Sequence, residues 1–167
     1  RRLARPSQAQ LDSLLRQVGS LKPDTDLLVA WPGVECRAWR QRLYASAPLP
    51  PPPVDFSTAW DGRTPLVLPA GCGVIEPLDR HEHAYAVRFA RGGDRIRLAG
   101  RTQHQCFKQL AQAAGLPPWI RQRMPVLLDG AQLLSIAGWW NAAEAPVLSW
   151  QPTPLPGLPK PPCFAPP

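Results

Sequence analysis

The stretch that decides the fold reads MPVLLDGAQLLSIA and spans residues 124–137. Apolar residues dominate 126–128 and 132–137, and the dipeptide Asp129-Gly130 separates these two runs. Because Asp-Gly accepts the positive φ angles of a tight turn, the stretch predicts an antiparallel β-hairpin. Further short strands are predicted at 27–31, 34–44, 65–69, 73–76, 85–89, 95–99 and 147–150, with 85–89 and 95–99 paired as a second hairpin.

Two helices are predicted from their capping residues. Ser7 followed by Gln10 is a capping box, and apolar residues at helical spacing continue it over 7–18. Thr102 followed by Gln105 has the same spacing and predicts that the second helix begins there. The fold class is therefore predicted as α+β. One small domain holds a helix with short antiparallel strands, and the other is a mixed β sandwich or barrel-like domain with one capped helix.

Proline is concentrated in two segments of the chain, a spacer and a tail, which together hold 13 of its 23 prolines. The run at 48–53 predicts a polyproline II spacer inside a first domain that extends over 1–76. A second domain is predicted over 84–150. The segment 151–167 is rich in proline and has no periodicity, so it is expected to be a flexible tail.

The net charge of +7 is concentrated in one segment of the chain. Eight cations and a single acid, Asp94, fall between Arg88 and Arg123, whereas cations and acids balance elsewhere. Of the 19 basic residues, 16 are Arg, which suits planar phosphate and base recognition better than Lys does. Such a block favours a nucleic acid as partner, and a solvated basic face without a partner is the alternative.

Length and composition exclude several classes of protein. With 167 residues, the chain is too short for a TIM barrel or a complete dinucleotide-binding fold. Pro, Gly or a charge interrupts every long apolar run, so no transmembrane span is expected. The sequence opens on Arg1-Arg2 without an apolar leader, and we interpret it as a cytoplasmic piece of a longer protein.

The common catalytic motifs are absent from the sequence. It has no GxxxxGK[ST] phosphate loop, no GxGxxG and no GxSxG. His81 and His83 offer a metal only two ligands, fewer than zinc sites need, so no metal site is predicted. The four cysteines show no C-x-x-C spacing and are predicted to be free thiols, with Cys106 a packing residue.

Basic residues and one aromatic residue make up the candidate binding site. Arg95 and Arg97 alternate with apolar residues, so both are predicted on the solvent face of one strand. This strand leads to Arg101 and to the start of the second predicted helix, where phosphate is favoured. Trp119 is interpreted first as a packing residue, with base stacking as the alternative. The predicted RNA-binding residues are Arg95, Arg97, Arg101, Lys108, Trp119 and Arg121, and no catalytic residue is predicted.

A series of short motifs runs through residues 84–140. They read RIRLAGR at 95–101, FKQL at 107–110, AGLPPWIR at 114–121, MPVL at 124–127 and LLSIAG at 133–138. Together they resemble the C-terminal domain of bacterial tRNA(Ile)-lysidine synthases, and PPWIR is the most specific of these motifs. Residues 1–76 are more weakly similar to the middle, substrate-binding domain of that family. The family helix carries two adjacent lysines where this chain has Phe107-Lys108.

The resemblance implies the activity of the whole enzyme. Family members use ATP, with Mg, to adenylylate C2 of the wobble cytidine of tRNA(Ile), and lysine then displaces AMP to give lysidine. The catalytic loop, Ser-Gly-Gly-x-Asp-Ser, belongs to an N-terminal domain and does not occur in this sequence. By this resemblance, the chain is expected to hold tRNA(Ile) on its acceptor-stem side, to bind no cofactor itself and to be inactive alone.

The residues alone are also compatible with two other functions. The proline-rich segments favour a non-catalytic protein-interaction module that offers them to aromatic grooves of a partner. An independent enzyme is the third alternative, and the missing nucleophile and phosphate-loop motifs argue against it. A homo-oligomer is left open, and no membrane partner is expected.

Overall fold

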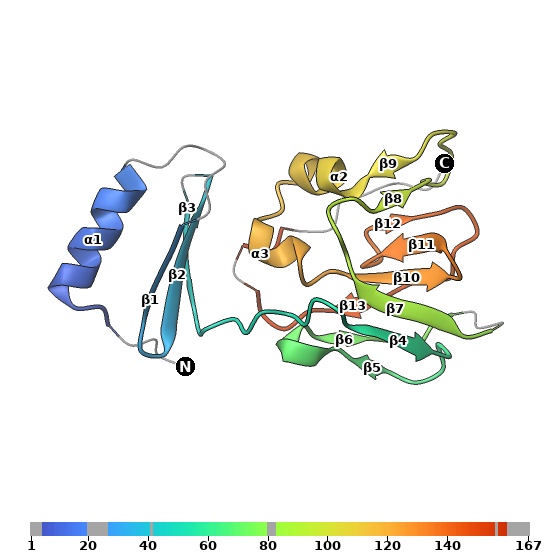
Figure 1. Cartoon of the computed structure of the whole chain (residues 1–167), viewed down its shortest axis with the longest axis horizontal. Coiled ribbons are helices and arrows are strands. Elements are labelled where there is room, and N and C mark those ends of the chain that lie inside the picture. Colours follow the sequence, from blue (N-terminus) through green and yellow to red (C-terminus); the bar gives the residue numbers. More distant parts are fainter. Residues whose placement is uncertain (1–4, 20–26, 41, 80–82, 156, 160–167) are drawn as a thin grey trace. The chain divides into compact units, whose positions relative to one another are not determined.

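The computed structural model describes residues 5–19, 27–40, 42–79, 83–155 and 157–159. The chain forms two compact units, Arg1–Pro50 with Leu155–Gly157, and Pro51–Pro154 with Leu158–Pro167 (Figure 1). The α+β class is confirmed, because few helices accompany several small antiparallel sheets. Within the described ranges these sheets are open, so the barrel-like variant of the prediction is not formed.

The N-terminal unit contains one helix and a three-stranded sheet. Helix α1 (Gln8–Gly19) begins with the predicted capping box. Ser7 N donates to Gln10 Oε1 at 2.8 Å, and Gln10 N donates to Ser7 Oγ at 3.3 Å. Strands β1 (Leu27–Trp31), β2 (Val34–Trp39) and β3 (Arg42–Ser46) pair antiparallel in the order β1-β2-β3. Leu14 of the helix and Val34 and Cys36 of the central strand are buried.

The boundary between the units lies at residues 50 and 51 rather than after residue 76. Strand β4 (Ser57–Trp60) pairs with β7 (Tyr85–Phe89), which belongs to the second unit. Strand β6 (Val74–Ile75) likewise pairs with β13 (Trp150–Gln151). Both pairings are made by backbone hydrogen bonds between segments distant in sequence, so the spacer 48–53 separates the units instead of interrupting one of them.

The C-terminal unit is built on a five-stranded antiparallel sheet of order β12-β11-β10-β7-β4. The predicted hairpin is its centre, since β10 (Pro125–Asp129) pairs with β11 (Gln132–Ile136) through the turn at Gly130. Strand β12 (Trp140–Asn141) adds to its edge. A second sheet has the order β13-β6-β5, where β5 is Leu66–Val67, and the short helix η1 (Pro69–Gly71) lies between β5 and β6.

A two-stranded ribbon replaces the hairpin predicted for 85–89 and 95–99. Strand β8 (Arg95–Ile96) pairs with β9 (Gln105–Cys106), whereas β7 pairs with β10 and β4. The backbone of residues 105–106 is therefore engaged in a strand, and Phe107 N donates to Asp94 O at 2.8 Å. Because of this pairing, the second helix cannot begin at Thr102, and the predicted capping box there is wrong.

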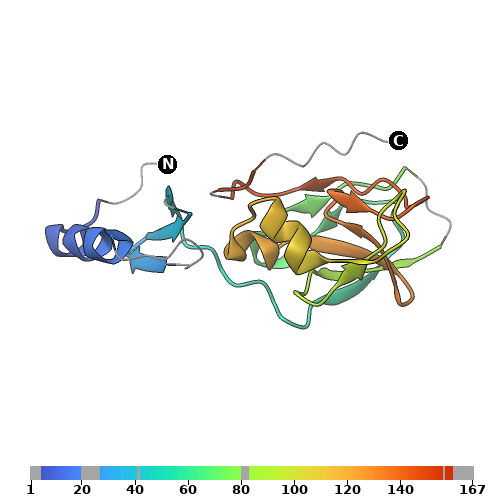
Figure 2. The same cartoon turned by 90° about the horizontal axis from the view of Figure 1, so that it is seen from above.

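The second helix, α2, spans Phe107–Ala113 with Cys106 at its N-cap, and the single turn α3 spans Pro118–Arg121. Figure 2 shows the two helices side by side. Phe107 of α2 packs edge-on against Trp140, with ring centroids 6.0 Å apart, and both side chains are buried. Helix α2 is thereby fixed to the core of the unit.

The segment predicted as a tail from residue 151 is packed in its first part. Gln151 belongs to β13, and Thr153 Oγ1 donates to the backbone oxygen of Gly71. Leu155 is buried, and Gly157 lies so close to the Tyr44 ring that a Cβ there would be 2.8 Å from Cε1. These residues contact the rest of the protein, although the side chains of Gln151 and Thr153 stay exposed, so this part of the segment is not a free tail. The remaining predicted tail, from residue 160, lies outside the described residues.

Candidate nucleic-acid interface

The eight cations of residues 88–123 fall into two groups, which differ in whether their side chains contact other protein groups or are exposed to solvent. Three of them, Arg88, Arg121 and Arg123, turn toward groups of the protein. The other five are exposed, and we call them the basic surface: Arg91, Arg95, Arg97, Arg101 and Lys108. All five come from one continuous piece of structure, which consists of the turn before β8, the β8–β9 ribbon with its connecting loop, and the first turn of α2.

Strand alternation places the central arginines as predicted. Ile96 is fully buried, which leaves its neighbours Arg95 and Arg97 exposed on the opposite face. The extended segment continues to Leu98, which forms a bridge with Ala142 at the edge of the large sheet. A short turn follows before Arg101. The ribbon is thus held on its apolar side, and its arginines are directed to solvent.

The one acid of this region is held by an internal ion pair. Arg88 Nη2 lies 2.7 Å from Asp94 Oδ1, and Arg88 Nη1 lies 2.8 Å from Asp94 Oδ2. The two side chains are only 16% and 10% exposed. The Asp94 carboxylate also accepts from the backbone nitrogen of Arg91 at 2.7 Å. Since Asp94 is matched by Arg88, it leaves the charge of the basic surface largely uncompensated.

Two of the predicted contact residues have other roles in the structure. Trp119 is only 4% exposed, which agrees with the packing interpretation and leaves little of its ring accessible for base stacking in this conformation. Arg121 is half-buried, and its Nε donates to the backbone oxygen of Leu116 at 2.8 Å. Arg123 is 3% exposed and donates to Cys72 Sγ at 3.5 Å. The three residues stabilise the region around α3.

A shallow hollow of about 280 Å³ lies beside the ribbon. Lys108 and Arg121 both line it, together with Gly92 of the turn before β8. Here Arg121, one of the three cations that turn toward the protein, lies beside Lys108 of the basic surface. A phosphate oxygen in this hollow would meet two positive side chains.

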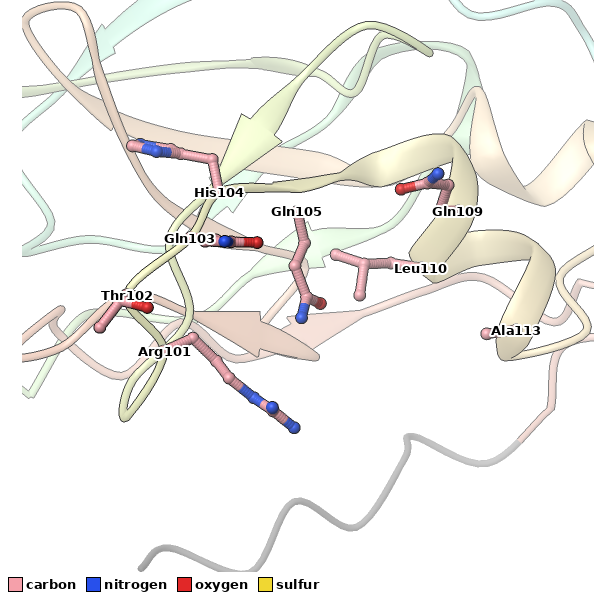
Figure 3. Close-up of a pocket in the computed structure, with 8 residues that line it drawn as sticks. All are labelled: Arg101, Thr102, Gln103, His104, Gln105, Gln109, Leu110 and Ala113. Carbon is pink, nitrogen blue, oxygen red and sulfur yellow. The ribbon is translucent and has the colours of Figure 1, made fainter.

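A larger hollow of about 470 Å³ lies between the loop after β8 and helix α2 (Figure 3). The residues that line it are Arg101, Thr102, Gln103, His104, Gln105, Gln109, Leu110 and Ala113. Six of these eight carry polar or charged side chains, and none is acidic. The sequence did not predict these glutamines as contact residues, because only the ribbon, its loop and α2 bring them to the same place. Arg91 was not predicted as a contact either, although it lies in the basic block.

Neither thiols nor metal ligands form a reactive cluster in the described part of the chain. Cys36, Cys72 and Cys106 are free, and Cys163 lies outside the described residues. Burial raises the pKa of the Cys72 thiol, and the neighbouring Arg123 guanidinium partly opposes that rise. His83 contacts Asp129 at 3.2 Å, while His81 lies outside the described residues. Over the described ranges, no group of three or more His, Cys, Asp or Glu is placed to hold a metal ion, and no helix is long and apolar enough to cross a membrane.

Two family models match this chain. The model described as the TilS substrate binding domain matches residues 1–44, and the TilS substrate C-terminal domain matches residues 85–152. Among similar proteins, the tRNA(Ile)-lysidine synthase of Xylella fastidiosa (strain Temecula1) is 38% identical over 141 residues, 81% of this chain and 32% of the relative. That of Xanthomonas campestris (strain 8004) is 35% identical over 160 residues, 89% of this chain and 37% of the relative.

The two models together cover about two thirds of the chain and define it as a substrate binding domain followed by a C-terminal domain of the same enzyme class. The chain belongs to the tRNA(Ile)-lysidine synthase family, which confirms the resemblance carried by the PPWIR region. It spans about a third of the length of the relatives it matches. The second model begins at Tyr85, the first residue of β7, and ends directly after β13.

Proposed function

We propose that this chain holds tRNA(Ile) for an ATP-dependent ligase that joins lysine to C2 of the wobble cytidine. The observation that carries the proposal is the basic surface, whose five exposed cations face solvent while Arg88 holds the nearby Asp94. The family supports the identity of the RNA, since its relatives are named tRNA(Ile)-lysidine synthases. A tRNA ligand also makes the cytoplasm the expected location.

The contacts we propose are mainly with phosphates of the acceptor-stem side. Double-stranded RNA presents its backbone and a shallow minor groove, so proteins bind it by shape and by phosphate contacts. Arg95 and Arg97 extend from one strand face, and Arg101 and Lys108 follow from the loop and helix next to it. Because these four charged groups come from the strand, its loop and the helix, they offer several separate contacts to a phosphate backbone.

Binding of tRNA(Ile) transcript, followed by fluorescence anisotropy over a range of salt concentrations, tests this function. Each phosphate contact steepens the fall of affinity with salt, so Arg95→Gln/Arg97→Gln should reduce the logarithmic salt slope by about two. The matched control is Arg42→Gln/Arg63→Gln, which removes two exposed cations from outside the basic surface. It should change the slope little. Equal effects of the two double variants, or no binding by the unmodified chain, would overturn the proposal.

We assign the ATP step, with Mg, to residues of the whole enzyme that this sequence does not contain. No Ser-Gly-Gly-x-Asp-Ser loop or other phosphate loop occurs in its 167 residues. Incubation of the chain with ATP, lysine and tRNA(Ile) should therefore give no lysidine, as measured by mass spectrometry of the digested RNA. Formation of lysidine by this chain alone would refute the assignment.

A further inference from the structure

The larger hollow contains polar groups that the protein itself does not use. It is lined by the side chains of Arg101, Gln103, Gln105 and Gln109, besides the apolar Leu110 and Ala113. Among residues that the structure describes, those four polar side chains make no hydrogen bond or ion pair with another protein group. Their donors and acceptors are therefore available to a ligand. No carboxylate lines the hollow, so an anionic ligand meets no repulsion there.

The arrangement of these side chains gives the hollow two different walls. Gln105 lies between Arg101 and Leu110, and its amide extends toward the same space as the Arg101 guanidinium (Figure 3). Leu110 points toward Gln105 from helix α2, and Ala113 lies one turn further along. His104 points away from them to the other side of the loop. One wall is thus apolar, and the other carries an amide and a guanidinium.

We propose that this hollow binds one unpaired adenine nucleotide of the RNA, an inference that rests on the proposed tRNA-binding function. A glutamine amide donates and accepts side by side, which matches the N7 and N6 groups of adenine. Leu110 and Ala113 provide an apolar surface for the face of the base, and Arg101 is placed to bind its phosphate. The volume of about 470 Å³ lies within the range of small-ligand sites.

The nucleotide must be unpaired, because Gln105 has to reach the N6 and N7 edge of adenine while Leu110 contacts its face. In an A-form helix the major groove is too deep and narrow for side chains to reach adenine N6 and N7. Splayed-out bases present both edges and a face, which is how most sequence-specific RNA recognition proceeds. The basic surface then supplies affinity for any duplex, and the hollow adds a preference for one nucleotide beside it.

The test uses the full chain and four RNA hairpins with the same duplex stem. One hairpin is blunt, and the others end in one unpaired 3′ nucleotide, which is adenosine, uridine or an abasic residue. We expect the adenosine hairpin to bind about tenfold more tightly than the blunt one, and the uridine and abasic hairpins to lose most of this gain. Gln105→Leu should reduce the gain to within about twofold. The matched control Gln132→Leu, an exposed glutamine on β11, should retain it.

The possible outcomes separate this inference from the proposed function. If all four hairpins bind with equal affinity and with a steep salt dependence, the basic surface binds RNA and the nucleotide site is overturned. If the abasic hairpin keeps the full gain, the hollow recognises only a phosphate, and adenine binding is overturned. If the chain binds none of the hairpins and no tRNA, the proposed function itself fails.

Discussion

Arg88 on β7 and Asp94 in the turn before β8 form a two-point ion pair, with distances of 2.7 and 2.8 Å. Arg88 lies opposite Ser57 of the edge strand β4 on one side and Val126 of the central strand β10 on the other. Asp94, through its backbone oxygen, accepts from Phe107 at the start of α2. This pair therefore ties the ribbon and α2 to the large sheet, and it determines where the basic surface is presented.

Replacing Asp94 with Asn should destabilise the C-terminal unit. The substitution leaves Arg88 half-buried and poorly matched, so we expect the free energy of unfolding to fall by about 1 to 3 kcal/mol. Urea unfolding followed by tryptophan fluorescence measures it. Asp55→Asn, at an exposed position, is the control and should change stability by less than about 0.5 kcal/mol. Similar losses for both variants would show that the ion pair contributes nothing specific.

Substitutions of Trp119 should change stability rather than RNA recognition. The ring is buried, so Trp119→Ala removes a large core side chain and should cost about 3 to 5 kcal/mol. Trp119→Phe retains most of the volume and should cost about 1 to 2 kcal/mol. The RNA affinity of the folded Trp119→Phe protein should stay within about twofold of the unmodified chain. A large loss of affinity without a loss of stability would instead support base stacking.

Gly138 should tolerate no side chain, in contrast to Gly130. Both glycines have positive φ, +72° at Gly138 and +54° at Gly130. A Cβ at Gly138 would collide with the backbone oxygen of Leu148, whereas nothing lies within 4 Å of a Cβ at Gly130. We expect Gly138→Ala to cost at least about 2 kcal/mol and Gly130→Ala about 1 kcal/mol, measured by thermal or urea unfolding. Equal costs would indicate that backbone conformation alone matters.

The stability of the chain should fall at alkaline pH because of two buried thiols. Burial raises the pKa of Cys36 and of Cys72 above the ordinary value of 9.0, so the folded state favours their neutral forms. The unfolded chain loses these protons first, at about pH 9. The stability they contribute is therefore complete below that pH and is lost as pH rises toward the raised folded values.

The double variant Cys36→Ala/Cys72→Ala tests this pH dependence. Its midpoint of urea unfolding should fall less between about pH 8 and about pH 10.5 than that of the unmodified chain. We compare the change of the urea midpoint with pH, here called the slope, rather than the midpoint itself. The cost of the cavities that the substitutions create is the same at every pH and therefore does not affect the slope. Cys106→Ala, at a half-buried thiol, is the control and should keep the steeper slope. Identical slopes for all three proteins would contradict the prediction.

Local sequence signals predicted the structure correctly wherever the groups that pair lie within a few residues of each other in the chain. The capping box of Ser7 and Gln10 was confirmed, since both of its hydrogen bonds join residues three apart. The hairpin through Gly130 was confirmed for the same reason. The exposure of Arg95 and Arg97 followed from strand alternation around the buried Ile96. The family resemblance also needed only the sequence, because it rests on motifs such as PPWIR.

The start of the second helix and the boundary between the units depend on backbone pairing between distant segments. A short stretch of sequence gives no information about such pairing. The box of Thr102 and Gln105 does not cap a helix, because residues 105–106 pair with Arg95 and Ile96 instead. The unit boundary lies at residue 50 because β4 pairs with β7, across a long connection. Packing alone determined that Trp119 lies in the core and that three of the eight cations turn inward. The sequence by itself determined the positive charge of residues 88–123 and the family of the chain. Only the tertiary structure decided which of those cations form the basic surface. The physical reason is that side-chain direction depends on which backbone segments pair, and those segments are far apart in the chain.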